Sequence, residues 1–246
     1  MLSPFHVPWR PDVPDFARPR GEDLAEFAGR ACYQSWSRPN PATATNEGYI
    51  RNILKVGHFS VLEHASASFY IEGVSRSLTH ELVRHRHLSF SQLSQRYVDG
   101  SDAEFVMPPI MRRALKDTAP EGTTDEEIEA FFQGNDFFDD VRQAYEDIVN
   151  DLTELYPDAK RKQIREAARL VMPNATETKI VVTGNYRAWR HFIGLRAAEA
   201  ADAEIRELAV EICRQLQNEA PSVFGDFSFE QLEDGSTVAR AEFATS

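Results

Sequence analysis

The chain has 246 residues, of which 42% are hydrophobic and 27% charged, proportions close to those of ordinary globular domains. A chain of this length can bury a substantial core without disulfide bonds. The formal net charge of −12 argues against a general nucleic-acid binder, which needs many contacts between cations and phosphates. It does not exclude a small anionic ligand, because such a ligand needs only a local cluster of cations.

The sequence contains neither a signal peptide nor an apolar run long enough to span a membrane. We therefore expect a cytoplasmic protein with reduced thiols and no membrane contact. The two cysteines, Cys32 and Cys213, form no CxxC motif, and both lie on apolar helical patterns. We expect both to be small buried residues.

The first 20 residues are rich in proline and predict an extended arm, and residues 21–246 predict a single domain with an acidic variable region at about 101–158. Within that region, the strongly acidic residues 121–140 predict a surface insertion with a solvated face. Elsewhere the patterns predict helices over 22–34, 45–56, 75–85, 141–155, 159–172, 186–195 and 203–218, strands over 65–71, 104–106 and 177–183, and a hairpin tip at 234–235. No βαβ rhythm repeats, so the order favours the α+β class.

One basic stretch stands out against the acidic background: RHRHLSFSQLSQRY, residues 84–97. It holds Arg84, Arg86 and Arg96 and contains no acid, so local ion pairs cannot satisfy these arginines. Serines are interleaved among them. The planar guanidinium fork matches phosphate oxygens, and hydroxyl groups add further donors. The stretch therefore predicts a pocket for a phosphorylated ligand.

Two further arginine clusters occur later in the chain. The first consists of Arg161, Arg165 and Arg169, which are spaced four apart on one predicted helical face. The second consists of Arg187, Arg190 and Arg196 in the segment NYRAWRHFIGLR. For Arg161, Arg165 and Arg190 the sequence favours ordinary surface ion pairs, which are common and weak.

The histidines and the possible nucleophiles indicate a functional site less clearly than the arginines do. His80, His85 and His87 lie close together, but no HExxH motif is present, and the arginines beside His85 would repel a dication. We therefore predict no metal site, and a histidine bonded to a ligand or to backbone instead. The sequence has no GxSxG motif and no partner base near Ser94, so it does not predict covalent catalysis.

The basic stretch contains a longer motif: Arg84-His85-Arg86, seven residues, Ser94, any residue, and Arg96. In this motif the chain resembles the flavin-dependent thymidylate synthases. The segments GRACYQSW, GHFSVLEH, AARLVMPNATET and NYRAWRHFIGLRAAEAAD also agree with that family, and the resemblance covers about residues 24–218. Some relatives carry Glu at the position of Gln92 and Asn at that of His191.

The resemblance implies a small, mostly antiparallel sheet with several helices and no Rossmann unit. It implies a homotetramer whose active sites are shared between subunits. The implied reaction is the reductive methylation of dUMP to dTMP, with methylenetetrahydrofolate as carbon donor and NADPH as reductant through FAD. No enzyme cysteine acts as nucleophile in this reaction.

The resemblance also assigns residues. For FAD they are Ser60, Arg84, His85, Arg86, Gln92, Asn185, Arg187 and His191. For dUMP they are Glu81, Leu82, Val83, Arg84, Gln92, Leu93, Ser94, Gln95, Arg96, Arg169 and Arg196. Arg196 is the predicted catalytic residue, because its charge would stabilise a uracil ring deprotonated at N3.

Three alternatives remain open at this point. One is a nucleic-acid-binding module that uses the basic stretch, against which the net charge counts. Another is a metal-dependent hydrolase built on His80, His85 and His87. The third is a homologue that keeps the pocket but lacks turnover, although every arginine of the motif is present.

Overall fold

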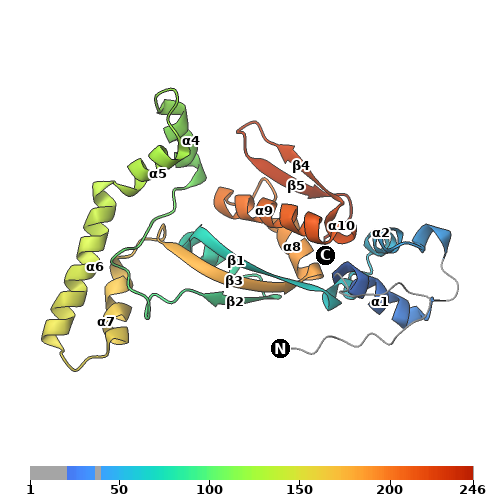
Figure 1. Cartoon of the computed structure of the whole chain (residues 1–246), viewed down its shortest axis with the longest axis horizontal. Helices are drawn as coiled ribbons and strands as arrows, with labels where there is room; N and C mark the ends of the chain where they lie inside the picture. Colours follow the sequence, from blue (N-terminus) through green and yellow to red (C-terminus); the bar gives the residue numbers. More distant parts are fainter. Residues whose placement is uncertain (1–20, 37–39, 246) are drawn as a thin grey trace.

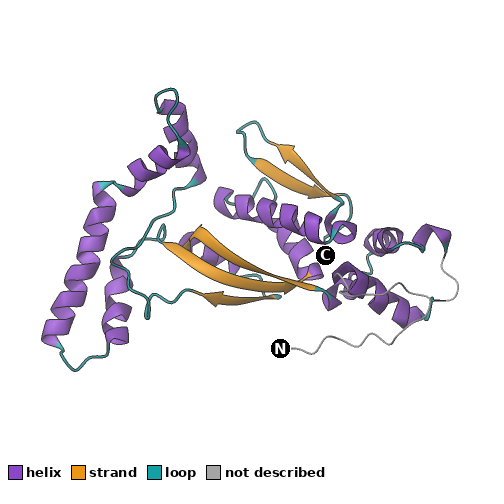
Figure 2. Ribbon diagram, in the orientation of Figure 1, coloured by secondary structure: helices purple, strands orange, loops and turns teal. Residues whose placement is uncertain are grey.

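The computed structural model describes residues 21–36 and 40–245, so the arm predicted for residues 1–20 lies outside the described residues. Figures 1 and 2 show a small central sheet with helices packed on it and a long helical arm at one end. The elements in chain order are α1 (Gly21–Tyr33), η1 (Pro41–Thr43), α2 (Asn46–Val56), η2 (Phe59–His64), β1 (Ser66–Ser75), α3 (Arg76–Leu82), β2 (Leu88–Gln92), α4 (Pro109–Thr118), α5 (Asp125–Gln133), α6 (Asp136–Leu155), α7 (Arg161–Ala168), η3 (Arg169–Val171), β3 (Glu177–Asn185), α8 (Tyr186–Arg196), α9 (Ala203–Glu219), α10 (Pro221–Phe224), β4 (Phe227–Gln231) and β5 (Thr237–Ala241).

The central sheet has the strand order β1-β3-β2, and both pairings are antiparallel. Strands β4 and β5 form a separate antiparallel hairpin. At its tip Gly235 has a φ of 79°, the left-handed conformation that glycine adopts without strain, as the Asp-Gly pair predicts. All strand pairs among the described residues are antiparallel, so the predicted α+β class without a Rossmann unit is confirmed.

Burial alternates along the sheet. On β1, Ile71 packs into the core, whereas its neighbour Tyr70 is 62% exposed and pairs with the exposed Val181 of β3. One face of the sheet therefore covers the core and the other faces solvent, the pattern of a half-buried antiparallel sheet.

The main core lies between the buried sheet face and helices α8 and α9. Trp189 and Phe192 of α8 are fully buried there. Gly184 of β3 lies where a Cβ atom would collide with the Leu88 side chain and crowd the Trp189 ring. Glycine at this position therefore lets β2 and α8 approach β3 closely.

The arm comprises α4 to α7 and has a small hydrophobic cluster of its own. Phe105 stacks on Phe138 with ring centroids 4.2 Å apart. The acidic residues 121–140 are not only a solvated insertion: they form α5 and the start of α6. Thr124 and Glu127 close a capping box at the start of α5, so the helix begins where the sequence offers paired capping groups.

Three expectations differ from the structure in detail. Helix α3 ends at Leu82 rather than near residue 85, so the basic stretch begins in a turn. The strand predicted over 104–106 is a single bridge between Phe105 and Thr176. Strand β2, within the basic stretch, was not predicted. Among the described residues, no helix has both the length and the apolar character needed to cross a membrane.

Candidate active site

The basic stretch starts in the turn between α3 and β2. The Ser75 hydroxyl caps α3 by accepting a hydrogen bond from the Leu78 amide, 3.0 Å away. The turn closes where the Leu88 amide donates to the His85 carbonyl at 3.2 Å. Within the turn, Arg84 is exposed and His85 is half-buried. The capped helix and the following strand therefore fix the turn from both sides.

Helix α8 brings a second set of predicted residues to the same place. The Asn185 side chain caps the helix by accepting from the Ala188 amide at 2.8 Å. Arg187 and His191 are four residues apart and share a face of this helix. Arg196 forms its last turn. Because the cap fixes the first residue of α8, it also fixes the positions of Arg187, His191 and Arg196 along the helix.

Arg196 is the centre of a contact network that we call the Arg196 cluster: Glu81, His85, His191 and Arg196. One Nη of Arg196 donates to the Glu81 carboxylate at 2.6 Å, and its Nε donates to Nε2 of His85 at 3.0 Å. The His85 and His191 rings lie edge to face, with centroids 6.4 Å apart. Four predicted residues from α3, its following turn and α8 are therefore brought together.

His85 is a neutral acceptor in this cluster. Burial lowers its pKa to about 4, and the adjacent Arg196 and His191 act in the same direction. Since Nε2 accepts the bond from Arg196, any proton on the neutral ring lies on the other nitrogen. His85 thus orients the guanidinium without adding a charge of its own.

Glu81 is subject to opposing influences. Burial and the neighbouring Asp202 carboxyl raise its pKa, whereas Arg196 and Arg84 lower it, and the net direction is upward. Its ion pair with Arg196 by itself would lower the pKa. The upward shift therefore means that desolvation and a second carboxyl outweigh the ion pair.

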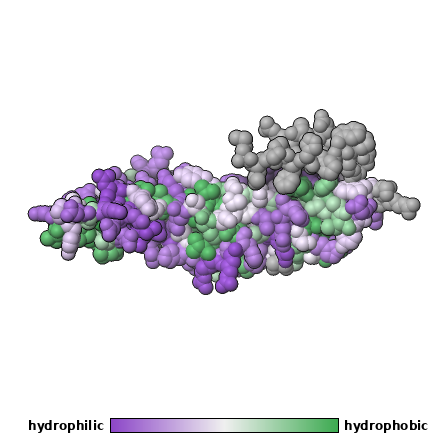
Figure 3. All heavy atoms as spheres, turned by 90° about the horizontal axis from the view of Figure 1, so that it is seen from below, coloured by the Kyte–Doolittle hydropathy of each residue, from purple (hydrophilic) through white to green (hydrophobic). Residues whose placement is uncertain are grey.

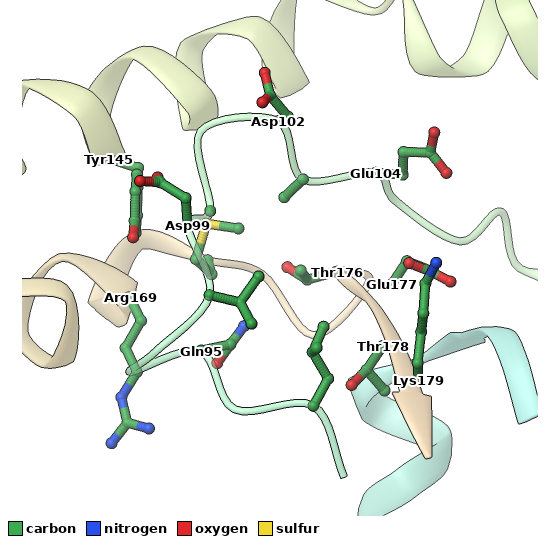
Figure 4. A pocket seen from close by; sticks show the side chains of 15 residues that line it. Gln95, Asp99, Asp102, Glu104, Tyr145, Arg169, Thr176, Glu177, Thr178 and Lys179 are labelled. Carbon is green, nitrogen blue, oxygen red and sulfur yellow. The ribbon is translucent and has the colours of Figure 1, made fainter. Parts of the chain in front are cut away.

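A second group of predicted residues lines a pocket of about 290 Å³ between the body and the base of the arm (Figure 4). Leu93, Gln95 and Arg169 contribute to its wall. Sequence reasoning missed Tyr145 of α6, which is almost fully buried at the same pocket. Within the described part of the chain, the Gln95 amide nitrogen is buried and without a hydrogen-bond partner. The pocket is therefore able to bind polar groups.

The remaining predicted residues are spread around these two groups. Gln92 already donates to Thr79 at 3.0 Å, and the Leu82 side chain lies fully in the core, so a ligand would meet Leu82 only through its backbone. The others lie at or near the surface: Ser60, Val83, Arg84, Arg86, Ser94 and Arg96. No hydrogen bond or ion pair among the described residues joins the pocket group to the Arg196 cluster.

The arginine predictions had mixed outcomes. Arg165 forms an ion pair with Asp99 at the surface, as expected. Arg190 does not lie at the surface: it is fully buried and pairs with Asp226 at 2.5 and 2.9 Å. Its placement as a surface ion pair was wrong. Arg96, for which the neighbouring sequence offers no acid, lies 3.6 Å from Glu166 of α7. Both partners are distant in sequence, so local composition could not reveal them.

The cysteines also differ from expectation. Cys213 is buried, and burial raises its pKa to about 12, but Cys32 is exposed, so the prediction that both are buried was wrong for Cys32. It lies near the end of α1, where the helix leaves the core. A search of the described ranges for three or more His, Cys, Asp or Glu side chains able to hold a metal found none.

The small antiparallel sheet with its covering helices defines an α+β protein, and Arg196 lies beside it between a half-buried acid and a neutral histidine. The family model described as thymidylate synthase complementing protein matches residues 16–222, and the chain belongs to that family. Among similar proteins, the flavin-dependent thymidylate synthases of Mycobacterium tuberculosis strain H37Rv and Mycobacterium marinum are 53% and 54% identical to it. Each alignment covers 100% of this chain and 93% of the relative.

A solved structure shares the fold. It is thymidylate synthase X from Helicobacter pylori, crystallised with FAD and dUMP. The structural match covers 85% of this chain and 94% of the Helicobacter pylori chain. Its TM-score is 0.57, and the sequence identity is 24%. At that identity the match supports the fold alone.

Proposed function

We propose that this chain converts dUMP to dTMP, with FAD as cofactor, methylenetetrahydrofolate as carbon donor and NADPH as reductant. Apart from membership of the family, one observation supports the proposal most. Arg196 is held by Glu81 and His85 in a position that leaves 23% of its side chain exposed. A preorganised guanidinium stabilises negative charge that develops on a bound pyrimidine ring.

The proposed FAD residues suit a flavin dinucleotide. Arg84 and Arg86 are exposed and form no ion pair with any acid in the described part of the chain, so both are available to the pyrophosphate. Arg187 is held by Glu63 at 2.5 Å on the exposed side of α8. When bound, reduced FAD supplies the reducing equivalents for the new methyl group. The protein side chains bind and orient the cofactor and keep cations near it.

The proposed dUMP residues provide donors for a phosphate and contacts for a base. Ser94 supplies a hydroxyl, and Arg96 and Arg169 supply guanidinium groups. The contact between Arg96 and Glu166 is long, 3.6 Å, and both side chains are more than 40% exposed. A pair of this kind is weak, so a phosphate can displace Glu166 from Arg96.

The proposal assigns no cysteine nucleophile. A buried thiol whose pKa is about 12, that of Cys213, stays protonated at neutral pH and is a poor nucleophile. The exposed Cys32 belongs neither to the Arg196 cluster nor to the pocket group. The task of activating uracil therefore falls to electrostatics, and Arg196 is our candidate for it.

The proposed assembly is a homotetramer with shared sites. In one chain the Arg196 cluster and the pocket group remain separate, although dUMP is assigned to both. The solvent face of the sheet also exposes Tyr70 and Val181, 62% and 40% accessible. Figure 3 shows hydrophobic patches between polar areas on the lower face of the molecule. Exposed apolar patches of this kind favour association with other subunits.

Mixing two inactive variants tests the shared site. Arg169→Ala and Arg196→Ala subunits are unfolded together and refolded as hybrids, and each variant refolded alone is the control. If one site uses Arg169 of one subunit and Arg196 of another, the hybrids regain part of the activity. Hybrids as inactive as either variant would contradict sharing between these two residues, provided that a tag on only one variant pulls down both kinds of subunit.

The first test of the function is a visible absorption spectrum of the purified protein. A yellow protein whose flavin band bleaches on anaerobic addition of NADPH, and which then makes dTMP from dUMP and methylenetetrahydrofolate, supports the proposal. A protein that stays colourless after FAD is added would show that its arginines serve another anion.

A further inference from the structure

The residues proposed to bind the phosphate of dUMP come from two distant parts of the chain. Ser94 and Arg96 belong to a segment after β2, residues 94–99, which we call the phosphate segment, whereas Arg169 follows the last residue of α7. The phosphate segment belongs to no helix or strand. Its Tyr97 and Val98 amides donate to the Ser94 carbonyl at 3.1 and 3.0 Å. These bonds fix the shape of the segment but not its position relative to α7.

Arg165 of α7 bonds to the far end of the phosphate segment. One Nη donates to the Tyr97 carbonyl, and the other donates to the Asp99 carboxylate. Asp99 is oriented in turn, because it accepts from the Ser101 amide at 3.2 Å and from the Ser101 hydroxyl at 3.1 Å. Only 13% of the Arg165 side chain is exposed, although Asp99 is 50% exposed. The guanidinium fork therefore holds both the backbone and a side chain of the segment.

Two neighbours of Arg165 on α7 make weaker contacts with the same segment. The Lys162 ammonium lies 5.2 Å from the centroid of the Tyr97 ring, and Glu166 lies 3.6 Å from Arg96. Exposed contacts of these kinds contribute little. The hydrogen bonds of Arg165 are charge-assisted and largely shielded from water, so this side chain holds the phosphate segment more firmly than its neighbours do.

The pocket wall combines residues from both sides of this contact. Arg169 lies four residues beyond Arg165, about one helical turn further along. It lines the pocket together with Gln95 and Asp99 of the phosphate segment (Figure 4). Because Asp99 is one of the two groups that Arg165 holds, the contact acts directly at the wall of the pocket.

We propose that Arg165 is a positioning residue: by fixing the phosphate segment to α7, it holds Ser94 and Arg96 where they can bind the same phosphate as Arg169. The inference rests on the proposed function. It deepens that function by naming the side chain that joins the two halves of the phosphate site.

The expected effect is on binding rather than on chemistry. A ligand that needs an ordered segment binds with an affinity reduced by the fraction of molecules in which the segment is ordered. If about a tenth of the molecules remain ordered without Arg165, the Kd of dUMP rises about tenfold. Arg165 is not among the residues proposed to contact the pyrimidine or the flavin, so kcat should change by less than about threefold.

A different role for Arg165 would be to neutralise Asp99 at the pocket wall. Burial raises the pKa of Asp99, but the hydrogen bonds from Ser101 and Arg165 outweigh it, so the net pKa is lowered and the carboxylate is ionised at neutral pH. A lysine at position 165 could neutralise that charge as well. It could not hold the Tyr97 carbonyl and the carboxylate together, because it lacks the planar fork.

Arg165→Ala and Arg165→Lys separate the two roles. The Kd of dUMP is measured by calorimetry on the holoenzyme and is expected to rise about tenfold in both variants, with flavin content unchanged. Deoxyuridine, which lacks the phosphate, should bind all three proteins within about twofold. The matched control is Arg161→Ala, which removes an exposed cation one turn earlier and should change the Kd of dUMP by less than about twofold. Full affinity in Arg165→Lys, or an equal loss for deoxyuridine, would overturn the inference.

Hydrogen exchange gives a readout without dUMP. In the holoenzyme, the peptide covering residues 94–99 should exchange about tenfold faster in both Arg165 variants, whereas peptides of α9 should not change. Unaltered exchange in that peptide would show that Arg165 does not hold the segment. If the unchanged protein binds dUMP but makes no dTMP, the proposed function fails and the binding data still decide the inference. An unchanged protein that does not bind dUMP would overturn both.

Discussion

The two sides of helix α8 use arginine for opposite purposes. On the core side, Arg190 is completely buried and held by both oxygens of Asp226 and by the Val223 carbonyl. At the end of the same helix, Arg196 keeps 23% of its side chain exposed and is held by Glu81 and His85. Both make short ion pairs with one carboxylate. What differs is how many of their donors the protein itself satisfies.

That difference separates a structural cation from one available to a ligand. Both Nη groups of Arg190 donate to fixed oxygens of α10 and the segment after it, so Arg190 ties α8 to the C-terminal part of the chain. Its Nε is buried without a hydrogen-bond partner among the described residues. Arg196 has one partner that is a neutral imidazole and one carboxylate, Glu81, whose side chain is 25% exposed. The resulting prediction is that core-side changes cost stability and that changes at Arg196 cost function.

The largest effect is expected from Asp226→Ala. Removing this carboxylate leaves the Arg190 guanidinium buried without a counter-charge, and breaking a buried pair from one side costs about 3–5 kcal/mol. The free energy of unfolding from urea titration measures it. The control is Glu207→Ala, which breaks the exposed pair with Arg112 and should cost less than about 1 kcal/mol. Equal losses in the two variants would remove the contrast between core and surface pairs.

Arg196→Ala tests the other side of the helix. We expect kcat to fall by about 10²–10³-fold, the usual loss when one preorganised donor to developing charge is removed. Flavin content and urea midpoint should stay close to those of the unchanged protein. Arg240→Ala, which breaks an exposed pair with Glu230, is the control for loss of a surface arginine. Unchanged turnover in Arg196→Ala would refute the activation role.

Arg187→Ala is expected to have a smaller effect. This arginine is on the exposed side of α8 beside Glu63 and is proposed to contact FAD, so its loss should weaken FAD binding by about tenfold, the value of one charge-assisted bond. Quenching of flavin fluorescence on titration measures the change. Arg51→Ala, from the exposed pair with Glu242, should leave FAD affinity unaltered. An equal loss in both variants would point to general electrostatics rather than contact.

The neutral state of His85 predicts a pH effect on stability. Its folded pKa of about 4 lies below the value near 6.5 of an unfolded histidine, so the unfolded chain takes up a proton first. Stability should therefore fall as pH drops from about 6.5 to about 4, by on the order of 1 kcal/mol after allowing for solvent screening. Comparing urea midpoints at both pH values with those of His85→Gln, which lacks the titrating ring, isolates this contribution. The same pH slope in both proteins would assign the loss to other groups.

The smallest effect is expected from replacing both cysteines by serine. Neither thiol belongs to the residues proposed to contact uracil, so kcat should stay within about twofold of the unchanged protein. Any stability loss should come from Cys213, which is fully buried, and the single Cys32→Ser variant is the control for it. A complete loss of turnover in Cys32→Ser, with the fold intact, would restore a nucleophile mechanism.

Local signals in the sequence predicted much of the fold correctly. The helices predicted over 45–56 and 186–195 and the hairpin tip at 234–235 lie where the structure has them. Each depends on residues close to it in the chain: Gly57 ends α2, and Asn185 caps α8. The signals for α5 and β2 were also local, namely the Thr124–Glu127 capping pair and the alternation of Leu88 and Phe90 with serines. In both segments charge is the most prominent feature of the composition, and charge by itself does not predict a helix or a strand.

The site was only partly predictable for a different reason. The basic turn and the residues of α8 are marked by composition and by family resemblance. Their partners are not: Asp226 holds Arg190, and Glu166 lies near Arg96, only because the tertiary structure brings distant segments together. A sequence pattern therefore identifies charged groups, whereas the fold decides which of them are neutralised.

The strand order β1-β3-β2 also governs how the site is made. Strands β1 and β2 follow one another closely in the chain but do not pair with each other, because β3 lies between them. Strand β3 is synthesised only after the whole arm, so the sheet must close a long loop late in folding, a step that is slow for non-local strand pairs. The arginine-rich turn thus emerges early from the ribosome and stays without its supporting strand until about residue 185 is available. A nascent chain stopped before β3 would carry the complete motif and no sheet to hold it.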